Sequence, residues 1–407
     1  MNRVAVIGAG ASGLVASVFA ARSGADVTLL EGERDCGRKL LLSGGGRCNV
    51  LPGEVDGGRF VTGSSVNTLR RILRSWPLAD QVRFFEQDVG VPLVQEGGGG
   101  RFPASGRAAQ MRDALLALVE RHGVHVMRSC RITGISREDD TWRAFPTSGD
   151  VLSFDALVVA TGGLSYPETG SDGAGLAMLA ELGLTTTPTY PALTPISSGP
   201  SPFNALTGLT VDAVLTAERD GERFSSSGGF LFTHTGYSGP AVLEVSHVLS
   251  RSQAEGVGGA VLTAHWTGLS AAQWDARLRT GGRTSVLSVL REELPQRLAA
   301  VLLERAGVAA ETRLGDLRRV DRTAVVAALV ACRLPWNGCG GYDRAEVTGG
   351  GVSLSEIAPS TMESKRHGGL FLCGELLDVF GLIGGNNLLW AWVTGRAAGA
   401  AAARSGR

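Results

Sequence analysis

The sequence has little that would direct it to nucleic acid or to a membrane. Lys+Arg and Asp+Glu number 39 each among 407 residues, so the formal net charge is zero and no long-range field attracts a polyanion. The longest apolar run near the C-terminus, from Leu388 to Ala403, is interrupted by Thr394, Gly395 and Arg396 and is rich in alanine. This run therefore predicts a buried helix and not a membrane span.

The sequence also lacks the patterns of a disulfide framework, a metal site or a secretory leader. Its six cysteines lie far apart without a Cys-x-x-Cys pair, which predicts reduced thiols and no redox-active disulfide. Its histidines show no paired spacing with each other or with acids, so we expect no metal site. Strand-like residues begin by Val4 with no charged and apolar leader before them, and we expect a cytoplasmic protein.

Apolar residues make up 43% of the chain and charged residues 19%, which is typical of a globular protein with a sizeable core. At this length we expect roughly two or three domains of ~100–200 residues each. The 58 glycines cluster in short runs without a fixed period. Such runs indicate loops in which the backbone closely approaches something else.

The N-terminal residues predict a βαβ unit. A short apolar strand, Arg3–Ile7, is followed by a glycine-rich turn, Gly8–Gly13, and by a helical pattern from about Leu14 to Ser23. A second strand, Asp26–Leu30, closes on Glu31. Further along, the residue pattern predicts helices over 69–88 and 108–122, and strands over 125–127, 131–135 and 155–160.

The middle of the chain differs from both ends. Short strands follow a proline-rich segment that starts near Tyr190, and residues 269–334 are rich in Leu, Ala and Arg at helical spacing, with Pro295 expected to kink or divide the helix. Glycine-rich texture returns after Val347. We therefore predict a discontinuous dinucleotide-binding domain over 1–190 and 347–407, a β-rich insertion over 191–268 and 332–346, and a helical subdomain over 269–331.

The turn after the first strand has the full context of a dinucleotide site. Gly8 permits the tight turn, Gly10 lets the backbone approach a pyrophosphate, and Gly13 lets the helix pack closely on the strand. The helix N-terminus, with Ala11 and Ser12, then presents unpaired N–H groups to the phosphate. The acid at position 31 follows Gly13 at the right distance to accept hydrogen bonds from a ribose.

Two downstream segments favour FAD over NAD, because an extended FAD needs contacts at its adenylate, its ribityl chain and its flavin ring. An apolar strand ends in a small, polar turn at Ala160–Gly163, and a second glycine-rich crossing begins at Gly374. Backbone N–H groups at the start of the last helix can stabilise negative charge at the pyrimidine edge of the reduced ring. The residues expected to bind FAD in these segments are Ala160, Thr161, Gly162, Gly374, Glu375, Asp378, Gly385, Asn386, Asn387 and Leu388.

The segment Gly37–Asn49, together with Arg101–Pro103, Phe232–Pro240, Thr348–Val352 and Gly374–Asp378, carries a family resemblance. With these motifs the chain resembles the HI0933-like flavoproteins, also called BaiN/YhiN-type NAD(P)/FAD-dependent oxidoreductases. The resemblance extends from residue 3 to about residue 400. It implies a fold of the α/β class, namely a glutathione-reductase-type FAD-binding Rossmann domain with an inserted β-barrel-like domain and a small helical domain.

The loop Ser43–Asn49 combines flexible backbone with one cation and one amide. Lys39 and Arg47 can pair with phosphate or bind a substrate anion, and Asn49 can hydrogen-bond the polar edge of the flavin. The cofactor-binding residues expected in and around this segment are Arg38, Lys39, Ser43, Gly44, Gly45, Arg47 and Asn49, and Arg131 is expected further along. Cys48 is more readily explained as a small packing residue, but it remains a catalytic candidate.

A flavin reductase that delivers a hydride to an activated C=C bond also needs a proton donor. His234 and Tyr237, in a loop rich in Gly and Ser, are the main candidates, and Tyr166 comes after them. No second nucleotide-binding motif is visible, because Gly170–Gly175 does not follow a strand. We therefore expect NAD(P)H to dock transiently at the flavin.

Three functions remain open. The first is an FAD-dependent, NAD(P)H-linked oxidoreductase that reduces or forms an activated C=C bond in a small organic substrate by hydride transfer through flavin N5. The second, implied by the resemblance, is reduction of uridine to dihydrouridine in ribosomal RNA. Arginines between 277 and 322 can contact phosphates. The acids interspersed among these arginines, however, are more typical of a solvated helix face. The third is a flavin-binding protein without turnover. The sequence leaves the oligomeric state open.

Overall fold

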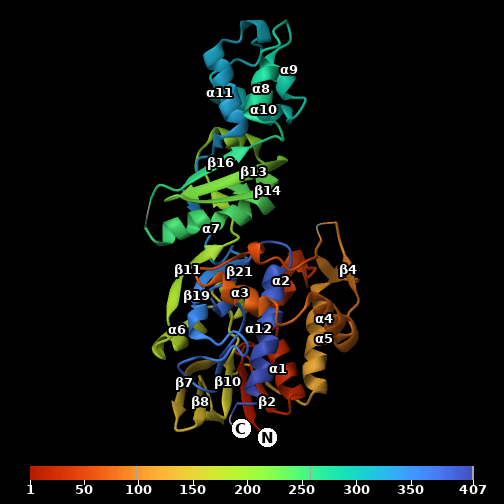
Figure 1. Cartoon of the computed structure of the whole chain (residues 1–407), viewed down its shortest axis with the longest axis vertical. Helices are drawn as coiled ribbons and strands as arrows, with labels where there is room; N and C mark the ends of the chain where they lie inside the picture. The colour runs from red at the N-terminus through yellow and green to blue at the C-terminus, as the bar shows by residue number, and fades with distance from the viewer. Residues whose placement is uncertain (98, 257, 406–407) are drawn as a thin grey trace. The chain divides into compact units, whose positions relative to one another are not determined.

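The computed structural model describes residues 1–97, 99–256 and 258–405, which divide into two compact units. The first unit comprises Met1–Thr189 and Val347–Arg407, and the second comprises Tyr190–Glu346. Each unit contains its own hydrophobic core. Figure 1 shows how the blue C-terminal elements return to the red N-terminal ones within the first unit.

A five-stranded parallel sheet lies at the centre of the first unit, in the order β20-β10-β1-β2-β6. Apolar side chains fill β1 and β10, and nearly all are buried, which is typical of parallel strands covered on both faces. The fold is therefore the predicted α/β class with a Rossmann-type parallel sheet. The bounds of its strands are β1 Arg3–Ile7, β2 Asp26–Leu30, β6 His125–Met127, β10 Ala156–Val159 and β20 Leu370–Leu372.

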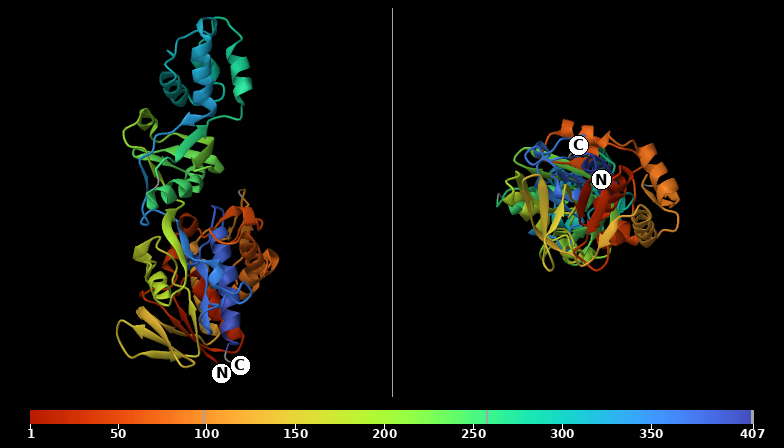
Figure 2. Two further views of the ribbon diagram at one scale, coloured as in Figure 1. Left: turned by 60° about the vertical axis from the view of Figure 1, so that its left-hand side comes forward. Right: turned by 90° about the horizontal axis from the view of Figure 1, so that it is seen from below.

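Two helices from opposite ends of the chain, α1 (Ala11–Arg22) and α12 (Asn386–Ala402), pack side by side in both views (Figures 1 and 2). Glycines in α12 make this approach possible. A Cβ atom added at Gly395 would lie 2.4 Å from the carbonyl oxygen of Ser12, and one added at Gly399 would lie 2.0 Å from that of Ala16. The two chain ends also meet, because the Asn2 side chain donates hydrogen bonds of 2.7 Å to the carbonyls of Ala402 and Ser405.

Smaller elements surround this centre. An antiparallel sheet of three strands, seen in yellow in Figure 2, follows β6, and the pairs β4–β5, β3–β21 and β11–β19 complete the strands. Their bounds are β3 Phe60–Val61, β4 Leu93–Gln95, β5 Arg101–Pro103, β7 Ile132–Glu138, β8 Thr141–Pro146, β9 Leu152–Phe154, β11 Thr186–Ala192, β19 Val347–Val352 and β21 Phe380–Gly381. The remaining helices of this unit are α2 Arg38–Gly46, α3 Val66–Leu73, α4 Leu78–Arg83, α5 Ala108–Arg121 and α6 Ala174–Glu181.

The prediction of one helix over residues 69–88 is wrong. The segment is divided into α3, α4 and a π-helical stretch, Phe84–Val89. The break falls before Pro77, which takes the N-cap position of α4, because a proline has no N–H to donate and disfavours helical geometry in the residue before it.

The second unit contains an antiparallel seven-stranded sheet in the order β17-β16-β13-β14-β15-β12-β18. Pro295 precedes α10 and divides the helical segment as expected. No helix in the described ranges is long and apolar enough to cross a membrane. The strands are β12 Ile196–Ser197, β13 Thr210–Arg219, β14 Glu222–Phe232, β15 Gly236–Ser238, β16 Val261–His265, β17 Cys332–Arg333 and β18 Gly338–Cys339, and the helices are α7 Pro240–Ala254, α8 Ala271–Leu278, α9 Val286–Leu290, α10 Gln296–Arg305 and α11 Arg319–Val330.

Candidate cofactor site

The turn between β1 and α1 has the backbone geometry of a phosphate cradle. Gly8 has a φ of +101°, and a Cβ atom there would lie 2.6 Å from the carbonyl oxygen of Ala160. A Cβ atom at Gly13 would lie 1.8 Å from the carbonyl oxygen of Gly8. At Gly10, by contrast, a Cβ atom would meet no described atom within 4 Å. Gly8 and Gly13 therefore serve the packing of strand and helix, whereas Gly10 borders open space beside the first N–H groups of α1.

Glu31 lies at the end of β2, beside this turn. Its carboxylate accepts the N–H groups of Ala9 and Glu33 at 2.8 and 2.9 Å. Burial raises its pKa, although the backbone N–H groups act in the opposite direction. Since a carboxylate has about four acceptor positions, two remain for the hydroxyls of a ribose.

Lys39 and Glu375 form an ion pair between segments that are far apart in sequence. The Lys39 ammonium lies 2.9 and 2.7 Å from the two carboxylate oxygens of Glu375, and the side chains are 26% and 20% exposed. One of these oxygens also accepts the N–H of Thr348 at 3.1 Å. The pair thereby holds a carboxylate at the start of the C-terminal crossing, where a ribityl hydroxyl would need an acceptor.

Thr348 extends this network to the turn after β10. Its hydroxyl oxygen accepts the N–H groups of Leu164 and Ser165 at 2.8 and 3.2 Å. Sequence reasoning had noted the run Thr348–Val352 but had assigned Thr348 no role. The signal was present, because a threonine before three glycines offers a hydroxyl beside backbone that can approach other segments closely.

The predicted loop Ser43–Asn49 begins inside a helix. The segment α2 is regular as far as Leu42, and then Ser43 is extended while Gly44 and Gly45 are left-handed, with φ values of +57° and +65°. In the amide orientation that satisfies both of its polar atoms, Asn49 donates to the carbonyl of Leu51 at 3.2 Å and accepts the N–H of Gly385 at 3.3 Å. The loop therefore reaches the residue that caps α12.

The asparagines at the start of α12 fix the loop that precedes it. The Asn387 side chain bonds both the N–H and the carbonyl of Gly381 at 2.7 Å, and Asn386 donates to the carbonyl of Leu382 at 3.0 Å. The backbone N–H groups of this first turn, up to Leu388, have no carbonyl one turn earlier in the helix to bond with. Such unpaired N–H groups at a helix start attract negative charge, which is the role that the sequence predicts for them.

Two buried polar atoms of expected cofactor residues have no hydrogen-bond partner within residues 1–97, 99–256 and 258–405. They are the hydroxyl oxygen of Thr161, in the turn after β10, and the side-chain oxygen of Asn386. Buried polar atoms are nearly always paired in native structures, so an unpaired one indicates a missing partner. Together with the open space at Gly10, these atoms fit a site for a large polar cofactor such as FAD.

Asp378 differs in its surroundings from the other expected cofactor residues. It is only 3% exposed and accepts the Ser64 hydroxyl at 2.9 Å, and burial raises its pKa. Its backbone carbonyl also accepts the Thr62 hydroxyl. Asp378 therefore anchors the segment that follows β3.

The basic candidates all pair with carboxylates. Arg38 lies 2.6 Å from Glu33, Arg131 pairs with Asp172, and Arg47 pairs with Glu96. The Arg47 guanidinium also lies 4.7 Å from the ring centroid of Phe102. Arg47 therefore combines an ion pair with a contact to an aromatic ring.

The proton-donor candidates lie in different environments. His234 is exposed and lies between β14 and β15 of the second unit. Tyr237 is 1% exposed among aromatic rings that include Phe230, and burial raises its pKa to about 12. Cys48 is fully buried in the first unit, and burial raises its pKa to about 12 as well. Of the three, His234 is the group that solvent and ligands can reach.

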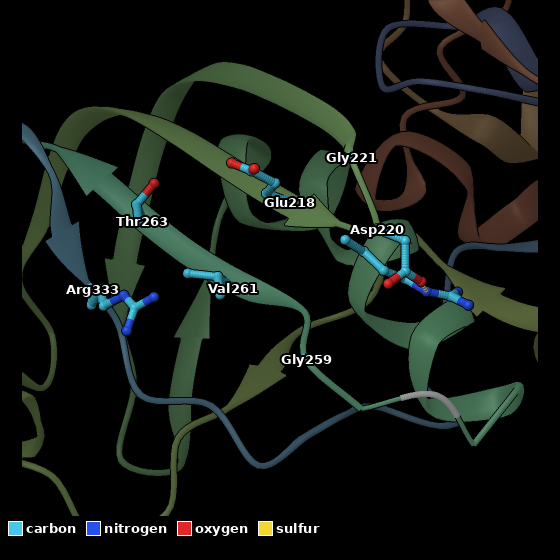
Figure 3. Close-up of a pocket in the computed structure, with 8 residues that line it drawn as sticks. Glu218, Asp220, Gly221, Gly259, Val261, Thr263 and Arg333 are labelled. Carbon is cyan, nitrogen blue, oxygen red and sulfur yellow. Dashed lines mark hydrogen bonds and ion pairs between the residues drawn. The ribbon is translucent and has the colours of Figure 1, made fainter.

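A hollow of about 330 Å³ lies on the sheet of the second unit (Figure 3). Its lining comes from the end of β13 and the turn after it, from β16 and the segment before it, and from β17, and it includes Glu218, Arg219 and Arg333. Arg219 already pairs with Asp220 and Glu255. The hollow contains none of the residues expected to bind the cofactor.

Comparisons with known proteins show the family of this chain. The family model described as "HI0933-like protein Rossmann domain" matches residues 2–401. The chain is 31% identical to the 3-dehydro-bile acid delta(4,6)-reductase of Clostridium scindens over 99% of both chains. It is also 31% identical to the ribosomal RNA dihydrouridine synthase of Escherichia coli, over 95% of this chain and 94% of that protein.

Solved structures of similar fold are oxidoreductases. The 3-ketosteroid delta1-dehydrogenase of Sterolibacterium denitrificans has a TM-score of 0.55 at 12% identity and matches 99% of this chain and 100% of its own. The 3-ketosteroid-delta4-(5alpha)-dehydrogenase of Rhodococcus jostii RHA1 has a TM-score of 0.51 at 17% identity, over 99% and 97%. At these identities the likeness shows a shared fold. The family model matches nearly the whole chain, and the fold is that of the parallel-sheet oxidoreductases named above. We conclude that this chain belongs to the HI0933-like family and is an FAD-dependent oxidoreductase.

Proposed function

We propose that the protein reduces, or in reverse forms, an activated C=C bond in a small organic substrate, with NAD(P)H as a transiently docked electron donor. Support comes from the reductase relative that matches 99% of both chains and is named for a bile acid. FAD, when bound, supplies the hydride through its N5 atom. The six thiols suit a reducing compartment, and we propose the cytoplasm.

The observation that carries this proposal is the convergence of Asn49, Gly385 and the first turn of α12. An amide and several backbone N–H groups at one place would stabilise negative charge on a flavin ring bound there. Lys39 and Glu375 supply an acceptor of fixed orientation for the ribityl chain. These groups of the first unit support the proposal that it binds and polarises the cofactor.

We propose His234 as the group that gives a proton to the substrate carbon next to the one that accepts the hydride. It is exposed, and its backbone carbonyl accepts the Asn204 side chain at 3.3 Å, which holds the turn in place. Tyr237 and Cys48 remain predictions, and their burial favours roles in packing.

A second candidate function is uridine reduction in ribosomal RNA, because a relative of equal identity is named for it. The arginines of the helical segment do not favour it. Arg277 pairs with Glu292 and Glu293, and Asp275 pairs with both Arg279 and Arg322. Arginines that are already neutralised by acids have fewer N–H groups to offer phosphates. We therefore rank this function second.

The test is an anaerobic reduction of the FAD-loaded protein with NADH or NADPH, followed by addition of a 3-oxo-4,6-diene steroid and product analysis by mass spectrometry. We expect the flavin absorbance to bleach and then to return with formation of a dihydro product. A dihydrouridine map of ribosomal RNA from a deletion strain runs in parallel. Loss of a dihydrouridine, together with no turnover of the steroid, would favour the second function and refute the first.

A further inference from the structure

Arg47 is carried by an unusual stretch of backbone. The three residues before it, Gly44, Gly45 and Gly46, have φ values of +57°, +65° and +84°. The residue after it, Cys48, also has a positive φ, +61°, although it is not a glycine. A non-glycine residue in this region is strained and persists only where the surrounding structure enforces it. Full burial of Cys48 provides that enforcement, and the strained segment projects Arg47 outward.

The contacts of Arg47 fix its orientation but leave it accessible. Its guanidinium lies over the ring of Phe102 at 4.7 Å from the centroid and pairs with Glu96. The side chains of Arg47 and Glu96 are 46% and 40% exposed. An exposed ion pair of this kind contributes little to folding stability. Stability alone therefore does not explain why a strained loop presents this residue.

The surroundings place Arg47 near the residues that the sequence predicts to contact the flavin ring. The segment after it is joined to the β4–β5 hairpin, because Val50 donates to the Arg101 carbonyl at 2.8 Å and Arg101 donates to the Leu51 carbonyl at 2.7 Å. Asn49, two residues from Arg47, accepts the N–H of Gly385 at the cap of α12. The adenylate end, marked by Glu31, belongs to a different part of the sheet edge, at the end of β2.

We propose that Arg47 is the anchor for a carboxylate on the small-molecule substrate and that Glu96 occupies the guanidinium until the substrate displaces it. This inference rests on the proposed function and specifies its substrate class as an organic acid. A guanidinium binds a carboxylate through two parallel hydrogen bonds. The Phe102 ring holds the guanidinium plane in place through a cation–π contact, so less side-chain freedom is lost when the acid binds.

The experiment compares a 3-oxo steroid that carries a side-chain carboxylate with its methyl ester, on FAD-loaded wild type, Arg47→Gln, Glu96→Gln and the control Arg143→Gln. Arg143 forms a similarly exposed pair with Glu138 on the β7–β8 hairpin. Binding is measured from the change in flavin absorbance on titration, and KM from turnover. We expect Arg47→Gln to weaken binding of the acid on the order of tenfold and to leave the ester unchanged. Glu96→Gln should strengthen binding of the acid, and the control should change neither.

The opposite signs at positions 47 and 96 distinguish ion pairing with substrate from a general disturbance of the loop. If Arg47→Gln weakens binding of the acid and of the ester equally, the proposal is wrong. It is also wrong if Arg47→Gln changes only the KM of NADH or NADPH, because Arg47 would then bind the nucleotide phosphates. Tighter binding of an RNA fragment than of the acid, lost in Arg47→Gln, would overturn it too. The titration measures binding and requires no turnover. If the acid binds in an Arg47-dependent way but is not reduced, the proposed reaction is wrong while the role of Arg47 stands.

Discussion

Replacing Gly399 by alanine should destabilise the protein, although the same change in most helix interiors is stabilising. The helix-propensity gain of a Gly-to-Ala change is about 1 kcal/mol. At Gly399 the new Cβ atom would lie 2.0 Å from the carbonyl oxygen of Ala16, far inside the 3.4 Å at which ordinary contact begins. The obstacle is backbone, so no side-chain rotation can relieve it and α1 and α12 must separate.

Overpacking of a well-packed core costs typically 1–3 kcal/mol, and a backbone clash this close belongs at the upper end. After the propensity gain is subtracted, about 2 kcal/mol of destabilisation remains. For a unit of this size that corresponds to a fall in Tm of roughly 4–8 °C. Because the first turns of α1 and α12 both belong to the cofactor site, FAD affinity should fall as well.

The assay is calorimetric unfolding of apoprotein and FAD-loaded protein, with flavin fluorescence titration for affinity. Ala400→Ser, at the neighbouring and half-buried position, is the control and should leave both readouts nearly unchanged. Ala16→Gly combined with Gly399→Ala should not restore stability, because the clash involves the Ala16 carbonyl and not its methyl group. An unchanged or raised Tm in Gly399→Ala would refute the close approach of the two helices.

Three further predictions concern charged and titratable groups. Lys39→Met should raise the Kd of FAD about 5–30-fold, because the partly buried carboxylate of Glu375 loses its cation. Flavin fluorescence titration measures this Kd. If the effects of Lys39→Met and Glu375→Gln are additive in a double-mutant cycle, the two residues are not coupled and the prediction is wrong. Burial lowers the pKa of His247 from 6.5 to about 4, so the unfolded chain takes up a proton at a higher pH than the folded chain does. The free energy of unfolding of the second unit should therefore fall by about 3 kcal/mol as the pH falls from 6.5 to below 4. His247→Gln should flatten this dependence of Tm on pH, and an equally steep dependence would contradict it. Burial raises the pKa of Asp378 above 3.8, so the ionised carboxylate destabilises the protein at pH 7, and this cost disappears in acid when the group is protonated. Asp378→Asn should therefore keep or raise Tm at pH 7. A clear fall in Tm would show that the carboxylate is needed.

The parts of the fold that the sequence predicted depend on local patterns. The strands β1 and β2 have the predicted bounds, because a short apolar run between polar ends has few alternative structures. Helix α1 begins at Ala11, three residues before the predicted start, since the residues that face the phosphate cradle are small and not periodic. The break before Pro77 was missed although the proline was visible, because apolar spacing continues on both sides of it.

The interactions of the site depend on tertiary structure and were less predictable. The sequence indicated Lys39 and Glu375 as separate cofactor residues, but their ion pair joins positions 336 residues apart and has no local signal. The asparagines at 386 and 387 were expected at the cofactor, and their side chains also bond the backbone of residues 381–383, which the sequence did not indicate. Hydrogen-bond partners of this kind follow from how segments meet in space, which residue type alone does not determine.

Overall sequence similarity does not identify the substrate of this protein. Relatives named for a bile acid and for ribosomal RNA are each 31% identical to this chain over nearly its full length. Equal similarity to two proteins whose names give such different substrates means that overall sequence similarity cannot select between those substrates. Selection must therefore depend on individual side chains that can reach a substrate, and Arg47, half exposed and held by Phe102 and Glu96, is the one that we propose. If a single carboxylate binds there and its ester does not, the chemistry of the substrate follows from one ion pair, whatever the overall similarity to either relative.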